Sequence, residues 1–375
     1  MKLFECQSCG QILFFENTVC EHCRRAVGYL PEQSLLTALD SAGDRLWRPL
    51  EPSVKHEQVL YCSNHDDDVC NWLTTPDATG DRSFCLACRF NRTIPNLDTP
   101  GNLERWRKIE VAKHRLFYTL LRLKLPLKDR RQDPENGLVF DFLDDAPDGS
   151  SSVMTGHANG VITIAMREAD DASRERMRVE MGEYYRTLLG HFRHEIGHYY
   201  WNVLVRDAGR LDECRAVFGD DRADYQKALQ VYYDSPTPPD WQDSHVSVYA
   251  TSHPWEDFAE TWAHYLHIVS TLETACAFGV SVDPRVPGIG HASGRTLGDP
   301  YTQASFEDIM QAWLPLTYAV NSLNRSMGLA DFYPFVLTAG IMHKLAFIHR
   351  LIRESQPPQR DCSGANDQAS CTSHF

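Results

Sequence analysis

The chain has 375 residues, of which 42% are hydrophobic and 23% charged, a composition ordinary for a globular protein with a substantial core. About two or three domains are expected for this length. The formal net charge of −14 disfavours non-specific binding to nucleic acids or anionic membranes, because both need a basic surface. The sequence contains no signal-peptide pattern and no apolar run of about 18 residues, so we expect no membrane segment and a cytoplasmic location.

The N-terminal region is rich in cysteine. Eight of the twelve cysteines lie in the first 88 residues, in two sets of four. The first set forms two C-x2-C pairs and consists of Cys6, Cys9, Cys20 and Cys23. Each pair offers two thiolates on a tight turn, and four thiolates close a tetrahedral site with no open position. We therefore predict a structural zinc ribbon over residues 1–30.

The second cysteine set is less regular. It consists of Cys62, Cys70, Cys85 and Cys88. The last two form a C-x2-C pair, but too many residues separate the first two for a standard pair, and His65 could replace one of them as a ligand. We predict a second structural zinc within a ribbon-and-linker region at 31–98. In segments this small, zinc supplies much of the folding energy.

The rest of the chain predicts an α+β domain over residues 99–353. A helical pattern begins near Asn102, and apolar strands follow near 137–143 and 160–166. Helical patterns then cover 168–178 and 181–205, with Asp170 or Asp171 as a candidate cap of the first, and the pattern is mixed around 209–247. Further helices are expected at 254–278, opened by Pro254, and at about 329–353. The polar residues 354–375 are expected to form a disordered tail.

The segment His194–His198 reads HEIGH and matches the H-E-x-x-H pattern. Four-residue spacing on a helix places both imidazoles on one face, within reach of one metal ion. Zinc bound there lowers the pKa of a water molecule towards about 7. Glu195 stands where it can accept the proton as the water attacks a carbonyl. The motif therefore predicts a catalytic zinc bound by His194 and His198, with Glu195 as general base.

A catalytic zinc needs a third protein ligand. A third histidine in the longer H-E-x-x-H-x-x-G-x-x-H pattern is excluded, because Trp201 and Leu204 occupy its last two defined positions. The segment PWEDFAETWAHYLH instead places Glu256 and Glu260 on one helix face. We assign Glu256 as the ligand and Glu260 as the group that orients a histidine ligand. Glu260 remains the competing ligand.

Tyr249 stands seven residues before Glu256. A phenol near the zinc can donate a hydrogen bond to the oxyanion that develops during peptide hydrolysis. Tyr249 is therefore a candidate catalytic residue, although a tyrosine buried in the core is the alternative interpretation.

These segments together resemble the glutamate-zincins, or gluzincins. More closely, the sequence resembles a bacterial family of zinc-binding metallopeptidases with an N-terminal zinc ribbon. The resemblance is carried by the cysteine sets and by NGVITIAMREADD, MGEYYRTLLGHFRHEIGHYYW and PWEDFAETWAHYLH. The spacing of Tyr249 and Glu256 is also similar to the catalytic region of the anthrax lethal-factor type. That resemblance implies a zincin-like fold, with Glu256 as ligand and Tyr249 stabilising the transition state.

The sequence thus predicts a zinc metallopeptidase with one catalytic and two structural zinc ions, acting on a peptide or protein substrate. The ribbons could recruit a protein partner. Two alternatives remain: a zinc-ribbon adaptor whose peptidase fold does not cleave, and a nucleic-acid-associated protein. The basic runs RWRK and KDRR are too short to favour the last, because such runs are usually solvated faces.

Overall fold

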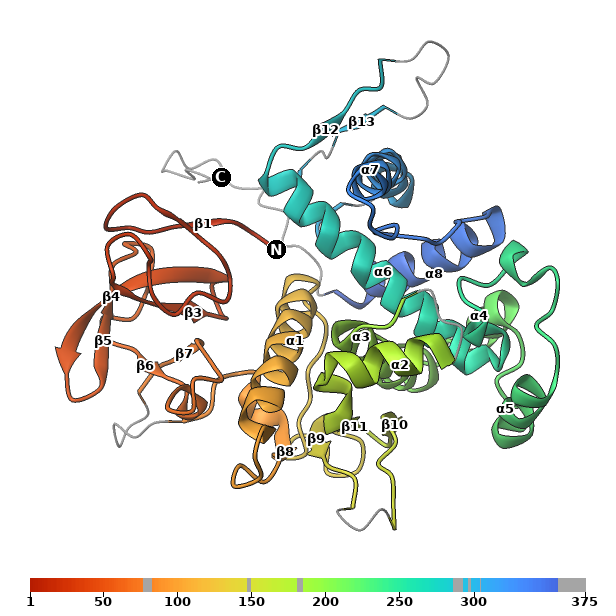
Figure 1. The fold of residues 1–375 in the computed structure, drawn as a ribbon, viewed down its shortest axis with the longest axis horizontal. Helices are drawn as coiled ribbons and strands as arrows, with labels where there is room; N and C mark the ends of the chain where they lie inside the picture. The colour runs from red at the N-terminus through yellow and green to blue at the C-terminus, as the bar shows by residue number, and fades with distance from the viewer. Residues whose placement is uncertain are drawn as a thin grey trace, which may run out of the picture.

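An N-terminal part made of short strands adjoins a C-terminal part made mainly of helices (Figure 1). The computed structural model describes residues 1–76, 83–146, 150–180, 185–285, 293–295, 298–303 and 305–356. The predicted α+β class is confirmed. Of the tail expected at 354–375, residues 357–375 lie outside the described residues, and 354–355 end the last helix. None of the helices in the described part of the chain combines the length and apolar character that a bilayer-spanning helix requires.

Short strands occupy the N-terminal part and pair mainly with their sequence neighbours. They are β1 (Phe4–Glu5), β2 (Ile12–Leu13), β3 (Ala26–Leu30), β4 (Leu35–Gly43), β5 (Leu46–Pro49), β6 (Leu60–Tyr61), β7 (Leu73–Thr74) and β8 (Asn91–Thr93). The antiparallel sheets are β1–β2, β3–β4–β5 and β6–β7. Strands β3 and β4 pair with each other although a domain boundary was expected between residues 30 and 31. The expected domain boundaries remain predictions. The sheet β3–β4–β5 was not anticipated from the sequence.

The C-terminal part contains a small mixed sheet and long helices. Its further strands are β9 (Val139–Leu143), β10 (Gly156–Ala158), β11 (Val161–Ala165), β12 (Ser281–Val282) and β13 (Gly294–Arg295). Its α-helices are α1 (Asn102–Arg122), α2 (Asp171–Glu180), α3 (Leu188–Trp201), α4 (Leu211–Phe218), α5 (Tyr225–Asp234), α6 (Pro254–Ala277), α7 (Phe306–Ser326) and α8 (Ala339–Ser355). Short turns of helix include η3 (Met166–Ala169), the π-helical η4 (Asn202–Arg206), η5 (Trp241–Asp243) and η6 (Tyr249–Thr251), with η1 (Ser63–His65) and η2 (Cys88–Phe90) in the N-terminal part.

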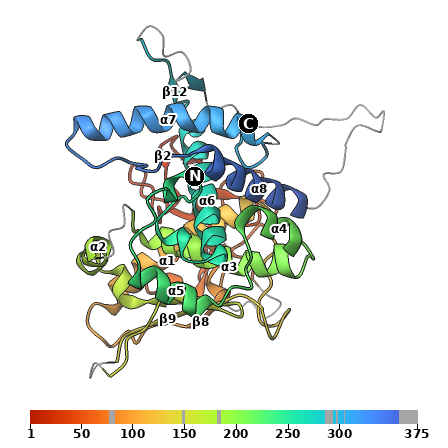
Figure 2. The same cartoon turned by 90° about the vertical axis from the view of Figure 1, so that its right-hand side faces the viewer.

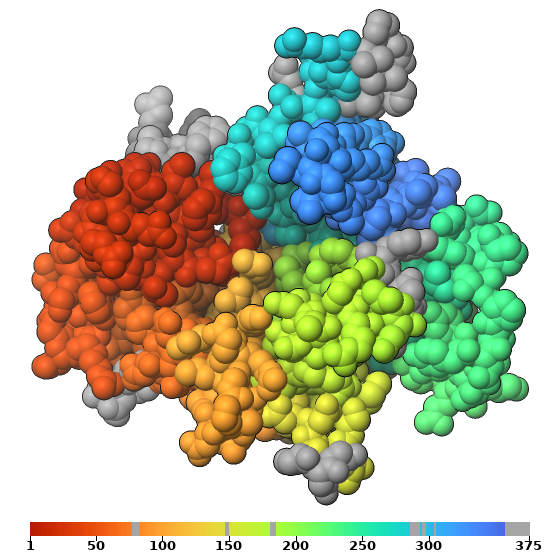
Figure 3. All heavy atoms as spheres, in the orientation of Figure 1, coloured from red at the N-terminus to blue at the C-terminus, as the bar shows by residue number. Residues whose placement is uncertain are grey.

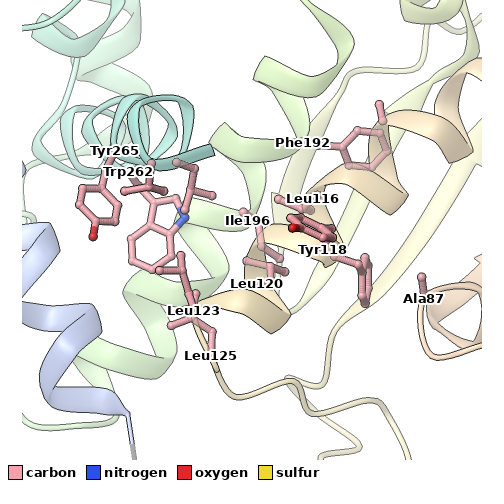
Figure 4. Close-up of a cluster of buried hydrophobic side chains, with 14 of the residues drawn as sticks. Ala87, Leu116, Tyr118, Leu120, Leu123, Leu125, Phe192, Ile196, Trp262 and Tyr265 are labelled. Atoms are coloured by element: carbon pink, nitrogen blue, oxygen red, sulfur yellow. The ribbon is translucent and has the colours of Figure 1, made fainter. Parts of the chain in front are cut away.

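The mixed sheet has the order β10–β11–β9–β8, in which β8, β9 and β11 are parallel and β10 is antiparallel. Aromatic contacts join the sheet to α1 and α3: the ring of Phe140 lies 5.8 Å from both Phe117 and Phe192. Helix α6 runs through the middle of the helical part, packed against α3 on one side and α7 and α8 on the other (Figures 1 and 2). Apolar side chains of α1, α3 and α6 form the core between these layers (Figure 4).

The N-terminal part packs directly on α1 and covers one side of the molecule (Figure 3). The ring of Phe15 lies edge-on to Tyr118 of α1 at 5.2 Å, and Trp72 lies 5.0 Å from His114 of the same helix. Buried residues of both parts belong to one continuous hydrophobic cluster. The cysteine-rich region therefore shares its core with the helical part.

Five helices differ from the sequence-based expectation. Helix α3 begins at Leu188 rather than upstream, because Thr187 is extended and its side chain accepts a hydrogen bond from Gly190 N at 3.0 Å. Helix α8 begins only at Ala339, since Pro334 disfavours helix before it and Thr338 caps the first turn. Helices α4, α5 and α7 were not anticipated. The cap of α2 agrees with expectation: Asp170 accepts a hydrogen bond from Ser173 N at 2.8 Å.

Helices α3 and α6 cross at very close range at Gly197. A Cβ atom on Gly197 would lie 3.0 Å from the Cα of Ala259 and 3.2 Å from the Cβ of Trp262. The missing side chain lets the two backbones approach. His253 caps the N-terminus of α6: its Nδ1 accepts a hydrogen bond from Trp255 N at 3.0 Å. The crossing brings the H-E-x-x-H face of α3 against the first two turns of α6.

We expect Gly197→Ala to lower the thermal stability. Overpacking a tight contact typically lowers the free energy of unfolding by about 1–3 kcal/mol. The higher helix propensity of alanine compared with glycine usually offsets less than this, about 0.8–1 kcal/mol. Calorimetry should show a lower unfolding midpoint, with weaker zinc retention. In the control Gly156→Ala the new Cβ would meet no atom within 4 Å, so its midpoint should stay unchanged. An unchanged midpoint in Gly197→Ala would mean that the crossing tolerates a side chain.

Candidate metal centre

The two histidines of the HEIGH segment meet a glutamate of α6. The Nε2 atoms of His194 and His198 lie 2.9 Å and 3.4 Å from the same Oε2 atom of Glu256. These three ligand atoms all lie within 4.8 Å of one another. Glu256 and His198 are almost completely buried, at 1% and 3% exposure. The structure therefore brings together all three residues predicted to bind the catalytic zinc.

This donor set fits a zinc ion. Zinc–ligand bonds of about 2.0–2.1 Å in a tetrahedron place neighbouring nitrogen and oxygen ligands about 3.3 Å apart. The distances of 2.9 Å and 3.4 Å lie on either side of that value. Two imidazoles and one carboxylate are also a donor set that leaves one position open.

Glu260 lies on the other side of His194. Its Oε1 atom is 2.7 Å from His194 Nδ1, and Ser247 Oγ donates to its Oε2 atom at 2.6 Å. Burial would raise the pKa of Glu260, but the contact with His194 outweighs burial and lowers the pKa to about 2. Glu260 is thus an anion that holds the His194 ring with Nε2 facing Glu256. Of the two competing carboxylates, only Glu256 approaches the Nε2 atoms of both histidines.

Glu195 and Tyr249 line a cleft of about 1080 Å³ beside these residues. Burial raises the pKa of Glu195 to about 7, against the opposing effect of His194, and a pKa near neutrality suits a group that must accept and release a proton. The ring of Tyr249, on η6, lies 5.9 Å from that of His194. Burial also raises the pKa of Tyr249 far above its usual range, so its hydroxyl keeps the proton and remains a donor.

Two residues around the centre were not identified from the sequence. The hydroxyl of Tyr225, on α5, donates to Glu256 Oε1 at 2.8 Å, which leaves Oε2 for the histidine side. The ring of Trp255 covers His198, with centroids 3.7 Å apart. Tyr225 lies 31 residues from Glu256 in the chain, and no local pattern connects the two. Only the folded arrangement reveals this contact.

The first cysteine set forms a compact cluster at the N-terminal end of the chain. All four Sγ atoms lie within 4.8 Å of one another, and two of the Sγ–Sγ distances are 3.6 Å. Zinc–sulfur bonds of about 2.3 Å imply sulfur atoms about 3.8 Å apart in a tetrahedron. Gly10 and Arg24 each stand four residues after the first cysteine of a pair, with φ of 74° and 63°. This left-handed turn folds each pair back on itself, and the cluster fits a structural zinc.

The second cysteine set is equally compact and entirely buried. The Sγ atoms of Cys70 and Cys85 are 3.7 Å apart, again the separation expected around zinc. His65 is not part of the cluster: its Nδ1 lies 2.9 Å from the carbonyl oxygen of Cys70, and its ring stacks on Tyr61 at 3.8 Å. The four cysteines, rather than His65, are the donors that the structure places together.

A histidine of α1 reaches this second cluster. His114 Nε2 lies 3.3 Å from Cys70 Sγ and 3.7 Å from Cys88 Sγ. Its Nδ1 donates to the carbonyl oxygen of Glu110 at 2.7 Å. The same helix buries an ion pair between Lys113 and Glu110 at 2.8 Å. The second cysteine cluster is therefore held by α1 as well as by its own loops.

Comparison with known proteins agrees with this arrangement. Residues 102–351 match the family described as "Putative zinc-binding metallo-peptidase", and residues 3–99 match a zinc-ribbon domain family. Proteins of Mycobacterium bovis and of two Mycobacterium tuberculosis strains, each named only as an uncharacterized protein, are 42% identical over 359 residues. The alignment covers 95% of this chain and 97% of each relative. No solved structure matches the chain significantly.

The family matches cover both the cysteine clusters and the helices that carry the histidine–glutamate centre. The chain belongs to this family of zinc-binding metallopeptidases and carries an N-terminal zinc-ribbon domain.

Proposed function

We propose that the chain hydrolyses peptide bonds in the cleft beside Glu195, using a zinc ion held by His194, His198 and Glu256. The observation that carries the proposal is the convergence of three ligand atoms, those of the buried His198 and Glu256 and the half-buried His194, beside a large cleft. A non-cleaving adaptor would have no use for Glu195, which lines the cleft next to the donor set and forms no ion pair with a cation in the described part of the chain. The acidic net charge of −14 gives no support to a nucleic-acid-associated role.

In this mechanism each residue has a separate task. A zinc ion bound at the centre would supply Lewis-acid activation of water and of the substrate carbonyl. Glu195 accepts a proton from the attacking water and delivers it to the leaving amine. Tyr249 donates a hydrogen bond to the oxyanion of the tetrahedral intermediate. Glu260 keeps the His194 ring in the orientation needed for binding through Nε2.

The two cysteine clusters complete the proposal. We assign them one structural zinc each, which gives three zinc ions per chain with the catalytic one. Four thiolates leave no open position for a substrate, so the clusters stabilise the fold and offer a surface that could recruit a protein partner or substrate. A cytoplasmic location is consistent with cysteines kept as thiolates for metal binding.

The roles of Glu256 and Glu260 predict different losses of zinc. Glu256→Ala removes a direct ligand and should strip most of the catalytic zinc. Glu260→Ala removes only the partner of His194 and should weaken zinc binding about 10–100-fold. Competitive zinc titration of both variants compares them directly. A greater loss of affinity in Glu260→Ala would reverse the two roles.

The two tyrosines near Glu256 predict opposite signatures. Tyr225→Phe removes the hydrogen bond to Glu256 Oε1 and should weaken zinc binding, as loss of an outer partner does by about 10-fold or more. Tyr249→Phe should leave zinc affinity unchanged and slow turnover by about 10²–10³-fold. Zinc titration and kcat for each variant separate the effects. Equal effects of the two substitutions on both quantities would show that the tyrosines share one role.

Glu195→Gln should keep the catalytic zinc and abolish hydrolysis. The substitution preserves size but removes the proton acceptor, whose loss typically costs about 10²–10⁴-fold in rate. Metal analysis of the purified variant gives the zinc content, and proteomic cleavage profiling against wild type gives the activity. Cleavage at the wild-type rate would rule out Glu195 as the general base.

A further inference from the structure

A second cavity of about 330 Å³ adjoins the catalytic cleft. The two share lining residues that form a partition between them: Tyr185, His264, His267 and Phe335. The second cavity lies among α1, α3, α6 and α7, and its wall includes the rings of Trp313 and Tyr333. A cavity of this size can hold a single amino-acid residue, since pockets for small ligands begin at about 300 Å³.

Arg193 lines this cavity and is only 3% exposed. Its guanidinium donates to His267 Nδ1 at 2.5 Å and to Ser270 Oγ at 2.8 Å, while its Nε–H has no hydrogen-bond partner. No carboxylate among the described residues forms an ion pair with it. An arginine stays protonated inside proteins, and buried charges are normally paired. Arg193 is therefore a buried cation without a matching anion in the described part of the chain.

His267 adds a second donor. An arginine can only donate hydrogen bonds, so His267 Nδ1 must be the acceptor and its proton must lie on Nε2. The Nε2 atom lies 3.9 Å from the point where a Cβ on Gly190 would stand, on the side of the catalytic cleft. Arg193 and the Nε2–H of His267 thus provide a positive charge and a hydrogen-bond donor at the partition.

The surroundings favour an anion as well. No aspartate or glutamate occurs among the described residues that line the cavity. The nearby Glu273, three residues after Ser270, is already neutralised by Arg122 at 3.4 Å and by the Met1 α-amino group at 3.3 Å. A ligand carboxylate would therefore meet Arg193 without competition from a lining acid.

We propose that this cavity binds a carboxylate of the peptide substrate at Arg193, with an aromatic side chain of the same residue against Trp313 and Tyr333. The inference rests on the proposed peptidase function and deepens it. Seven residues of α6 separate Glu260 from His267, or about 10 Å along the helix axis. About three extended residues span that distance, so one peptide can occupy both the catalytic cleft and the second cavity.

The test compares a carboxylate with its neutral analogue on the zinc-loaded full-length protein. N-acetylphenylalanine should bind at least about tenfold more tightly than N-acetylphenylalanine amide in calorimetric titration, as expected for a hydrogen bond to a charged partner. Arg193→Gln should remove this preference, and Arg107→Gln, which changes an arginine of α1 that contacts Asp67 instead, should retain it. Equal binding of acid and amide in wild type would overturn the proposal.

Two further arms make the result specific. A preference that persists in Arg193→Gln would place the carboxylate elsewhere, for example on the zinc, and would also overturn the proposal. If Arg193→Gln does not fold, Thr271→Phe, which fills the cavity from its wall without changing Arg193, should abolish the preference. N-acetyl-aspartyl-phenylalanine amide carries its carboxylate on the residue before the aromatic one: weaker binding than the free acid would support a C-terminal carboxylate on the aromatic residue itself, and tighter binding would overturn that assignment.

The same experiment separates this inference from the peptidase proposal. If the protein cleaves no peptide but keeps an Arg193-dependent preference for the acid, the carboxylate site stands and the peptidase proposal fails. If the protein cleaves peptides with free and amidated C-termini equally and binds acid and amide equally, the peptidase proposal stands and the carboxylate site is wrong.

Discussion

The close crossing of α3 and α6 is the contact on which the candidate centre depends. Gly197 allows it, because a side chain there would meet the backbone of Ala259 at 3.0 Å. The histidines lie on either side of this glycine along α3, and the glutamates lie on either side of Ala259 along α6. If a side chain at this position pushed the two helices apart, His194 and Glu256 would be too far from each other to bind the same metal ion. The glycine inside the HEIGH segment is therefore as important for geometry as its histidines are for chemistry.

Electrostatics explains why these groups are buried together. Three carboxylates, Glu195, Glu256 and Glu260, lie close to two imidazoles in a region with little exposure, and unpaired buried carboxylates are strongly unfavourable. A divalent cation at the centre would balance them. The second cysteine cluster follows a similar logic, since His114 of α1 lies beside two of its sulfur atoms. Because α1 also contacts α3, the zinc-ribbon region and the helices of the candidate centre share one structural support.

The sequence predicted the parts of this site that obey local periodicity. The four-residue spacing of His194 and His198 and that of the two glutamates follow from helix geometry, and the cysteine pairs follow from short-range turn chemistry. Tyr225 and His114 could not be predicted, because each acts through a tertiary contact with residues distant in the chain. The predicted starts of α3 and α8 were wrong for a local reason. Capping residues and a proline, rather than apolar content, decide where these two helices begin.

The central claim is that the α3–α6 crossing holds a zinc ion distinct from those of the cysteine clusters. Anomalous diffraction measured on both sides of the zinc absorption edge, on crystals of the full-length protein, tests it most directly. The account predicts three zinc peaks: one among His194, His198 and Glu256, and one in each cysteine cluster. Peaks at the cysteine clusters alone, from protein saturated with zinc, would contradict it.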